Sequence, residues 1–134
     1  MEETDMNDHI TLRVENIDET KMFYVSVLSP LGYRCGVDET DSSERVLGFV
    51  RDGKFDTWFT TGKPISGPCH IAWRANSRDD VDAFYRAAIA AGAQDNGEPG
   101  IREHFHPGYY SAFVIDPNGQ NIEVVCHLLL ESEL

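Results

Sequence analysis

The segment HITLRV at residues 9–14 recurs as HIAWRA at residues 70–75, and this pair decides how the whole chain is divided. The same offset of 61 residues, from 9 to 70, also relates the FY doublet at 23–24 to the one at 84–85. In both segments apolar and polar residues alternate, which is the pattern of a strand that buries one face. The sequence therefore predicts two copies of one structural unit.

Each copy continues with one predicted helix and then three predicted strands. Asp18 and Ser77 are the predicted N-caps of the helices, which we expect to stop at Gly32 and Gly92. The predicted strands are 33–37, 45–51 and 55–61 in the first copy and 93–95, 109–116 and 121–127 in the second. We accordingly treat residues 1–134 as a single domain with module one at 8–61, a linker at 62–67 and module two at 68–128.

The composition excludes several classes of function. The net charge of −12 repels a phosphate backbone, so nucleic acid is not an expected partner. No apolar run is long enough for a membrane-spanning helix, and the segment MEETDMND at residues 1–8 is acidic where a secretory signal would be basic. The odd number of cysteines, without C-x-x-C spacing, argues against a disulfide scaffold. We expect a cytoplasmic protein that acts on a small molecule.

Three polar side chains mark one face of the predicted sheets. His9 and His70 alternate with the apolar residues of their strands, and Glu123 does the same in NIEVVCH at residues 121–127. If the apolar faces pack on helices, these three side chains project from the other side. Two imidazoles and a carboxylate suit a divalent transition metal, although a histidine on a strand is more often a hydrogen-bonded structural residue.

The motifs HITLRVENIDETKMFY, SPLGY, HIAWRANSRDDVDAFY, GAQDNGEP and YYSAFVIDPNGQNIEVV together resemble the vicinal oxygen chelate superfamily, the glyoxalase, bleomycin-resistance and extradiol-dioxygenase group. The resemblance implies an α+β fold of two βαβββ modules, whose mixed sheet curls into a cup with the helices outside. It implies metal ligands at His9, His70 and Glu123, while Thr57 stands where the group has a fourth ligand. The expected cofactor is a divalent metal ion (Zn, Ni, Mn or Fe(II)).

Several other residues are candidates for the same cavity. His106 and Tyr110 are predicted catalytic residues beside Glu123, because an imidazole can act as an acid-base group and a phenol can donate a proton. Solvated loop histidines remain an alternative for His104 and His106, and either Tyr109 or Tyr110 must face the cavity by strand alternation. The predicted substrate-binding residues are Arg13, Arg74, His104 and Trp58.

We predict a metal-dependent, glyoxalase-like lyase or isomerase that chelates a small oxygenated organic molecule and stabilises its oxyanion. Two alternatives stay open at this point. One is a metal-free drug- or ligand-binding protein of the bleomycin-resistance type, and the other is an Fe(II) extradiol ring-cleaving dioxygenase. Two modules can close a cavity within one chain or by exchange between chains, and we favour a homodimer.

Overall fold

The computed structural model describes residues 7–41, 44–65, 67 and 69–127. The first half of the chain contains β1 (Ile10–Val14), α1 (Ile17–Leu28), the 3₁₀ helix η1 (Ser29–Leu31), β2 (Arg34–Asp41), β3 (Glu44–Arg51) and β4 (Lys54–Thr61). The second half contains β5 (His70–Arg74), α2 (Arg78–Ala90), β6 (Gln94–Ile101), β7 (Tyr110–Ile115) and β8 (Asn121–Cys126). Both halves therefore run strand, helix and three strands.

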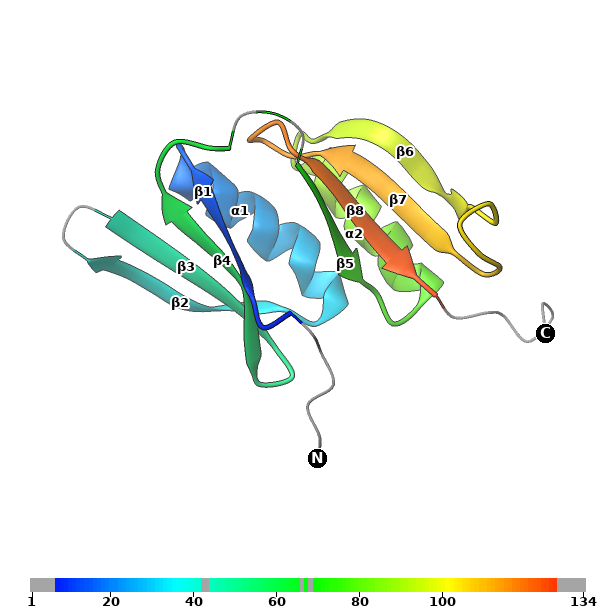
Figure 1. The fold of residues 1–134 in the computed structure, drawn as a ribbon, viewed down its shortest axis with the longest axis horizontal. Helices are drawn as coiled ribbons and strands as arrows, with labels where there is room; N and C mark the ends of the chain where they lie inside the picture. Colours follow the sequence, from blue (N-terminus) through cyan, green and yellow to red (C-terminus); the bar gives the residue numbers. More distant parts are fainter. Residues whose placement is uncertain (1–6, 42–43, 66, 68, 128–134) are drawn as a thin grey trace.

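Each half forms its own four-stranded mixed sheet, in the orders β1-β4-β3-β2 and β5-β8-β7-β6. The first and last strands of each half pair in parallel, and the remaining neighbours pair antiparallel. Both helices lie on the same side of the two sheets and leave the other side open (Figure 1). The predicted α+β fold with outer helices is confirmed.

The helix caps explain where the two helices begin. Ser77 caps α2 as predicted, since its side chain accepts a hydrogen bond from the backbone N of Asp80. The prediction of Asp18 as the first cap is wrong: Asn16 accepts from the backbone N of Glu19 and α1 starts two residues earlier than expected. Asp18 instead lies in the first turn, where its negative charge interacts favourably with the positive end of the helix dipole.

Strands β2 and β6 are longer than their sequences suggest. The predicted strand 93–95 extends to Ile101, because register shifts between Asp95 and Gly100 let the chain pass through a Gly- and Pro-containing stretch without leaving the sheet. The segment that follows, residues 102–109, connects β6 to β7. A backbone hydrogen bond joins the two ends of this segment: the N–H of Arg102 donates to the carbonyl oxygen of Tyr109, at 2.7 Å.

One hydrophobic core joins the two halves on the helix side. Phe59 of β4 stacks on Tyr24 of α1 at 4.5 Å between ring centroids, and Tyr24 also contacts Trp73 of β5 at 5.8 Å. The Tyr24 hydroxyl continues into the second half and donates to Asp116 in the turn between β7 and β8, at 2.6 Å. The core therefore fixes the two modules to each other through α1.

None of the helices within the described residues combines the length and apolar character that crossing a membrane requires.

Candidate functional site

The open face of the second sheet carries a paired histidine and glutamate. Because β5 and β8 are parallel neighbours, His70 and Glu123 project from the same face, and His70 Nε2 lies 2.8 Å from Glu123 Oε1. The Glu123 side chain is only 4% exposed, whereas that of His70 is 46% exposed. A nearly buried carboxylate therefore has a solvent-accessible imidazole as one of its partners.

Tyr109 is the other partner of Glu123. Its hydroxyl donates to Glu123 Oε2, so both carboxylate oxygens have a hydrogen-bonding partner. Burial, followed by the bond to Glu123, raises the pKa of Tyr109 to about 12. Consequently the phenol keeps its proton at neutral pH and can donate it as a hydrogen bond.

The placement predicted for Tyr110 is wrong. Tyr110 points to the helix side of β7, where its hydroxyl donates to Asp82 of α2 at 2.7 Å and its ring lies under Arg78. Strand alternation left a choice between the two adjacent tyrosines, and the structure assigns the position beside Glu123 to Tyr109.

His106 and His127 form a second pair next to Tyr109. Their ring nitrogens, His106 Nε2 and His127 Nδ1, lie 2.8 Å apart, so one ring donates and the other accepts. Both rings also make edge contacts with the Tyr109 ring. Burial, Arg74 and His106 lower the pKa of His127, which favours its neutral form. His104 is not part of this pair and packs on Phe105 at the exposed end of the segment.

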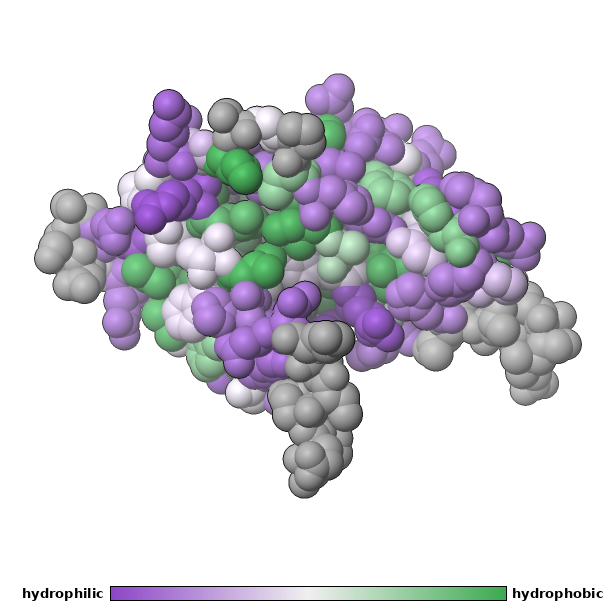
Figure 2. Space-filling view, viewed as in Figure 1, coloured by the Kyte–Doolittle hydropathy of each residue, from purple (hydrophilic) through white to green (hydrophobic). Residues whose placement is uncertain are grey.

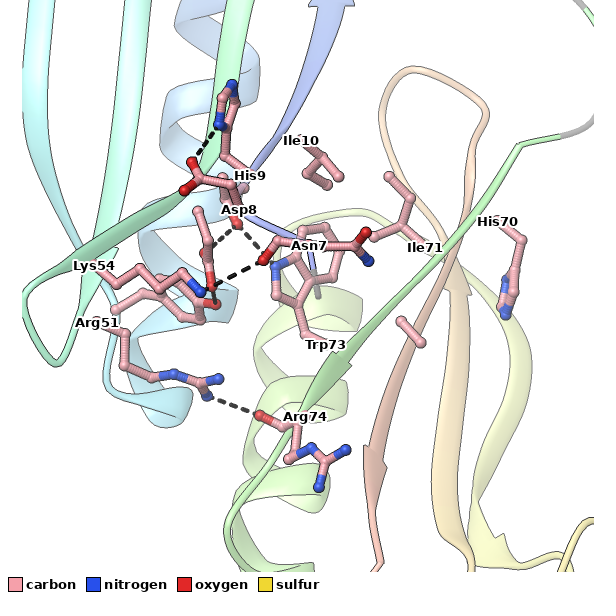
Figure 3. A pocket seen from close by; sticks show the side chains of 14 residues that line it. Asn7, Asp8, His9, Ile10, Arg51, Lys54, His70, Ile71, Trp73 and Arg74 are labelled. Carbon is pink, nitrogen blue, oxygen red and sulfur yellow. Dashed lines mark hydrogen bonds and ion pairs between the residues drawn. The ribbon is translucent and has the colours of Figure 1, made fainter. Parts of the chain in front are cut away.

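His9 belongs to the first module and has a different partner. Its Nδ1 lies 2.7 Å from Asp8 Oδ1, and the two side chains are 51% and 90% exposed. Figure 3 shows His9 and His70 at opposite sides of a pocket, with Ile10 and Ile71 between them. Within the described residues of one chain, no three His, Cys, Asp or Glu side chains come together as a metal-binding group.

This pocket has a volume of about 500 Å³ and a polar floor. Asp56 accepts from the hydroxyls of Tyr33 and Thr57, at 2.9 Å each, and Thr57 Oγ1 accepts from Trp73 Nε1 at 3.2 Å. Burial raises the pKa of Tyr33, so this phenol is a donor to Asp56 rather than a base. Thr57 is thus engaged in a buried network on the helix side of β4.

The expected ligand position in the first module is held by Trp58, and the prediction of Thr57 there is wrong. Thr11 pairs with Trp58 between β1 and β4, as Ala72 pairs with Glu123 between β5 and β8. Thr11 and Ala72 are related by the offset of the repeat, so Trp58 is the counterpart of Glu123. A register shift between Phe49 and Val50 on β3, opposite β4, accounts for the difference of one residue.

Trp58 and Phe55 form an aromatic platform on the open face of the first sheet. Their ring centroids are 5.6 Å apart with an interplanar angle of 30°. The platform lies directly on glycines: a Cβ at Gly48 would be 2.6 Å from the Trp58 ring, and one at Gly36 would be 2.8 Å from the Phe55 ring. The glycines therefore let both rings lie flat against the strands.

We expect Gly48→Ala to displace the Trp58 ring and to lower the free energy of unfolding by about 1–3 kcal/mol, because the added methyl overpacks the sheet face. Urea unfolding and the near-UV circular dichroism of tryptophan measure the two effects. Gly100→Ala is the matched control, since a Cβ there would meet its nearest atoms only at 3.9 Å. An unchanged near-UV spectrum in Gly48→Ala would contradict the platform.

The two arginines predicted to bind substrate lie on the open faces but in different settings. The Arg13 side chain is 62% exposed, and its Nη1 lies 3.9 Å from Glu44 Oε1. The exposed Arg74 ends β5 near His127. Sequence reasoning did not single out Arg102, which lies over the Phe113 ring on the open face of the second sheet. Its position in a Gly- and Pro-rich stretch gave no periodic signal.

The model of the Glyoxalase/Bleomycin resistance protein/Dioxygenase superfamily matches residues 7–124. This chain belongs to that superfamily. Among proteins with curated descriptions, none matches it by sequence. Members of the superfamily commonly dimerise and often use divalent metals.

Solved structures of superfamily members share the fold over nearly their full lengths. A glyoxalase/bleomycin resistance protein from Albidiferax ferrireducens is 26% identical, with a TM-score of 0.69 over 91% of this chain and 99% of that chain. A domain from a Frankia species is 15% identical, with a TM-score of 0.71 over 92% and 98%. The fosfomycin resistance protein FosX from Listeria monocytogenes, complexed with Mn(II) and sulfate, is 20% identical, with a TM-score of 0.63 over 93% of each chain.

Proposed function

We propose that this chain is a metal-dependent, glyoxalase-like lyase or isomerase acting on a small oxygenated organic molecule. The observation that carries the proposal is the His70–Glu123 pair, with 2.8 Å between His70 Nε2 and Glu123 Oε1 on an open sheet face. A carboxylate that is nearly buried is costly unless it is paired, and its partner here is an imidazole that reaches solvent. Such a pair supports a role in binding a cation or a reacting molecule.

The residues present fit a divalent metal ion. An imidazole nitrogen and a carboxylate oxygen already point at each other, and a metal would take the place of the proton between them. We propose His9 of a second copy of the chain as a third ligand, because His9 and the pair lie apart within one chain. When bound, the metal would act as a Lewis acid that holds two neighbouring substrate oxygens and stabilises negative charge on them.

An apolar strip supports the pairing of two copies. Ile10 and Leu12 of β1 and Ile71 of β5 pack against the hydrophobic core but are themselves only partly buried. Figure 2 shows hydrophobic residues gathered across the centre of this face, over β1 and β5 of Figure 1. Both strands are also sheet edges, so a second copy could cover them.

The side chains around the His70–Glu123 pair each have a different role in this proposal. Tyr109 donates its one hydroxyl proton to Glu123 and so holds this carboxylate in place beside His70. His106 is held at both ring nitrogens, by His127 Nδ1 at 2.8 Å and by the carbonyl oxygen of Pro107 at 2.9 Å, so the His106–His127 pair rather than His106 alone is the candidate group for moving a proton. Trp58 is on the same sheet as His9, so in this proposal the second copy would supply it as a flat apolar surface facing the substrate.

A metal-free ligand-binding protein is the second candidate, and Trp58 is the observation that favours it. An indole at the position equivalent to Glu123 cannot ligate a metal, but it binds planar molecules well.

Metal content separates the two candidates. We expect the gently purified wild-type protein to retain about one divalent ion per chain. Glu123→Gln is expected to lower the affinity for Mn(II) by more than about tenfold, because it removes a charged ligand. Elemental analysis and Mn(II) titration measure this, with the exposed Glu103→Gln as control. Wild-type protein that neither retains a metal nor binds added Mn(II) would support the binding-protein candidate instead.

A further inference from the structure

We propose that Arg102 binds an anionic group of the substrate and that Phe113 supports the body of the molecule between this group and the His70–Glu123 pair. The inference rests on the proposed function in one respect only, since it takes this pair as the place where the substrate oxygens are held. The substrate would be a compact molecule with two neighbouring oxygens at one end and a carboxylate or similar anion at the other.

Arg102 lies over the Phe113 ring on the open face of the second sheet. Its Cζ lies 5.1 Å from the centroid of the Phe113 ring, which is a cation–π contact. The side chain lies flat across β6, where a Cβ at Gly97 would be 3.1 Å from Arg102 Nη2 and 3.1 Å from Phe113. The absence of a side chain at Gly97 therefore leaves the space that the guanidinium occupies.

Phe113 connects Arg102 to the His70–Glu123 pair. Phe113 of β7 is the cross-strand partner of Glu123 of β8. The Phe113 ring also stacks on the His70 ring, with 5.8 Å between centroids and an interplanar angle of 20°. One aromatic ring thus contacts both the imidazole of the pair and the guanidinium. Phe113 therefore links the positive group to the carboxylate–imidazole pair on the second sheet.

The positive charge of Arg102 is available to an anion. Its described hydrogen bonds go to the carbonyl oxygens of Glu98, Gly100 and Ser111 and to the Ser111 hydroxyl, all of which are neutral. Within the described residues it has no carboxylate partner, which is unusual in a chain with a net charge of −12. Arg45, by contrast, contacts both Asp18 and Asp38.

Arg102 also has N–H donors that its described hydrogen bonds leave unused. A guanidinium has five N–H donors, and the described bonds of Arg102 involve Nη1 and one bond from Nη2. Nε and the second Nη2 hydrogen have no acceptor among the described residues. A planar carboxylate can accept from an Arg through two parallel bonds, and the backbone carbonyls already hold this side chain in position. Arg102 is therefore a pre-positioned anion-binding group.

A matched pair of probes tests the inference on the full-length protein with Mn(II). Catechol and 3,4-dihydroxybenzoate share the two neighbouring hydroxyls, and only the second has a carboxylate across the ring. We expect the wild-type protein to bind 3,4-dihydroxybenzoate about tenfold more tightly than catechol. Arg102→Gln is expected to abolish this preference without weakening catechol, Arg102→Lys to keep part of it, and the exposed Arg86→Gln to keep all of it.

The outcomes separate this inference from the proposed function. Equal binding of the two probes by the wild-type protein, or an unchanged preference in Arg102→Gln, overturns the role of Arg102. If the protein binds no Mn(II), the proposed function fails, and the metal-free protein is then titrated by NMR with benzoate and benzamide. Preference for benzoate that disappears in Arg102→Gln would still support the anion site, and its absence in the wild type would overturn it.

Discussion

His9→Ala chains and Glu123→Ala chains are each expected to lose tight metal binding, and an equal mixture refolded together is expected to regain about a quarter of the wild-type sites. In a twofold dimer that shares His9 with the partner's pair, half of the dimers in such a mixture contain one chain of each kind. Each of these mixed dimers has one site with all its ligands and one site that lacks two. Mn(II) titration of the separate and mixed proteins measures the recovery.

The physical reason is the separation of His9 from the pair within one chain. His9 lies beside Asp8 at the edge of the first sheet, whereas His70 and Glu123 contact each other on the second. The repeat places His9 and His70 at equivalent positions, so a twofold axis that joins module one of one copy to module two of another would bring them together.

The control uses two changes within one module. An equal mixture of His70→Ala and Glu123→Ala chains should recover nothing, since every pair in it lacks one member. Metal binding that survives in His9→Ala alone would show that His9 is not a ligand. Recovery in both mixtures would show that the loss in the separate variants came from misfolding rather than from missing ligands.

The fold could be predicted from the sequence because the patterns that indicate it are local and occur twice. Alternation in HITLRV and HIAWRA fixed which faces of β1 and β5 are apolar, and the offset of the repeat predicted that the two halves have the same element order. Element ends were less accurate, as the Asn16 cap of α1 and the extension of β6 to Ile101 show. Both depend on hydrogen bonds that composition does not specify.

The candidate site was only partly predictable, and the errors have one cause. Placing Trp58 rather than Thr57 opposite Thr11 depends on an irregular register between β3 and β4, and choosing Tyr109 over Tyr110 depends on where β7 begins. A shift of one residue moves a side chain to the other face of a sheet. Arg102 was not foreseen because its contacts are to backbone carbonyls and to Phe113, which no spacing rule describes.

The largest loss of stability is expected for Asp116→Ala, about 3 kcal/mol in the free energy of unfolding. Asp116 is 4% exposed and accepts from the Tyr24 hydroxyl at 2.6 Å and from the backbone N of Asn118 and Gln120 at 2.9 Å each. Burial raises the pKa of Tyr24, so its proton is available to this bond at neutral pH. Without the carboxylate, a buried hydroxyl and two turn amides lose their acceptor together.

Urea unfolding at a fixed protein concentration measures this loss, and the urea midpoint should fall by about 1–3 M. Tyr24→Phe is the informative partner variant, because it leaves Asp116 with its two backbone donors and is expected to cost only about 1 kcal/mol. The double variant should lose less free energy of unfolding than the two single variants added together. In Asp116→Ala the buried Tyr24 hydroxyl is left without an acceptor, whereas in the double variant that hydroxyl is absent. Glu15→Ala, an exposed change, is the control. If Asp116→Ala is no more destabilising than Glu15→Ala, the bond from α1 to the β7–β8 turn does not hold the two modules together.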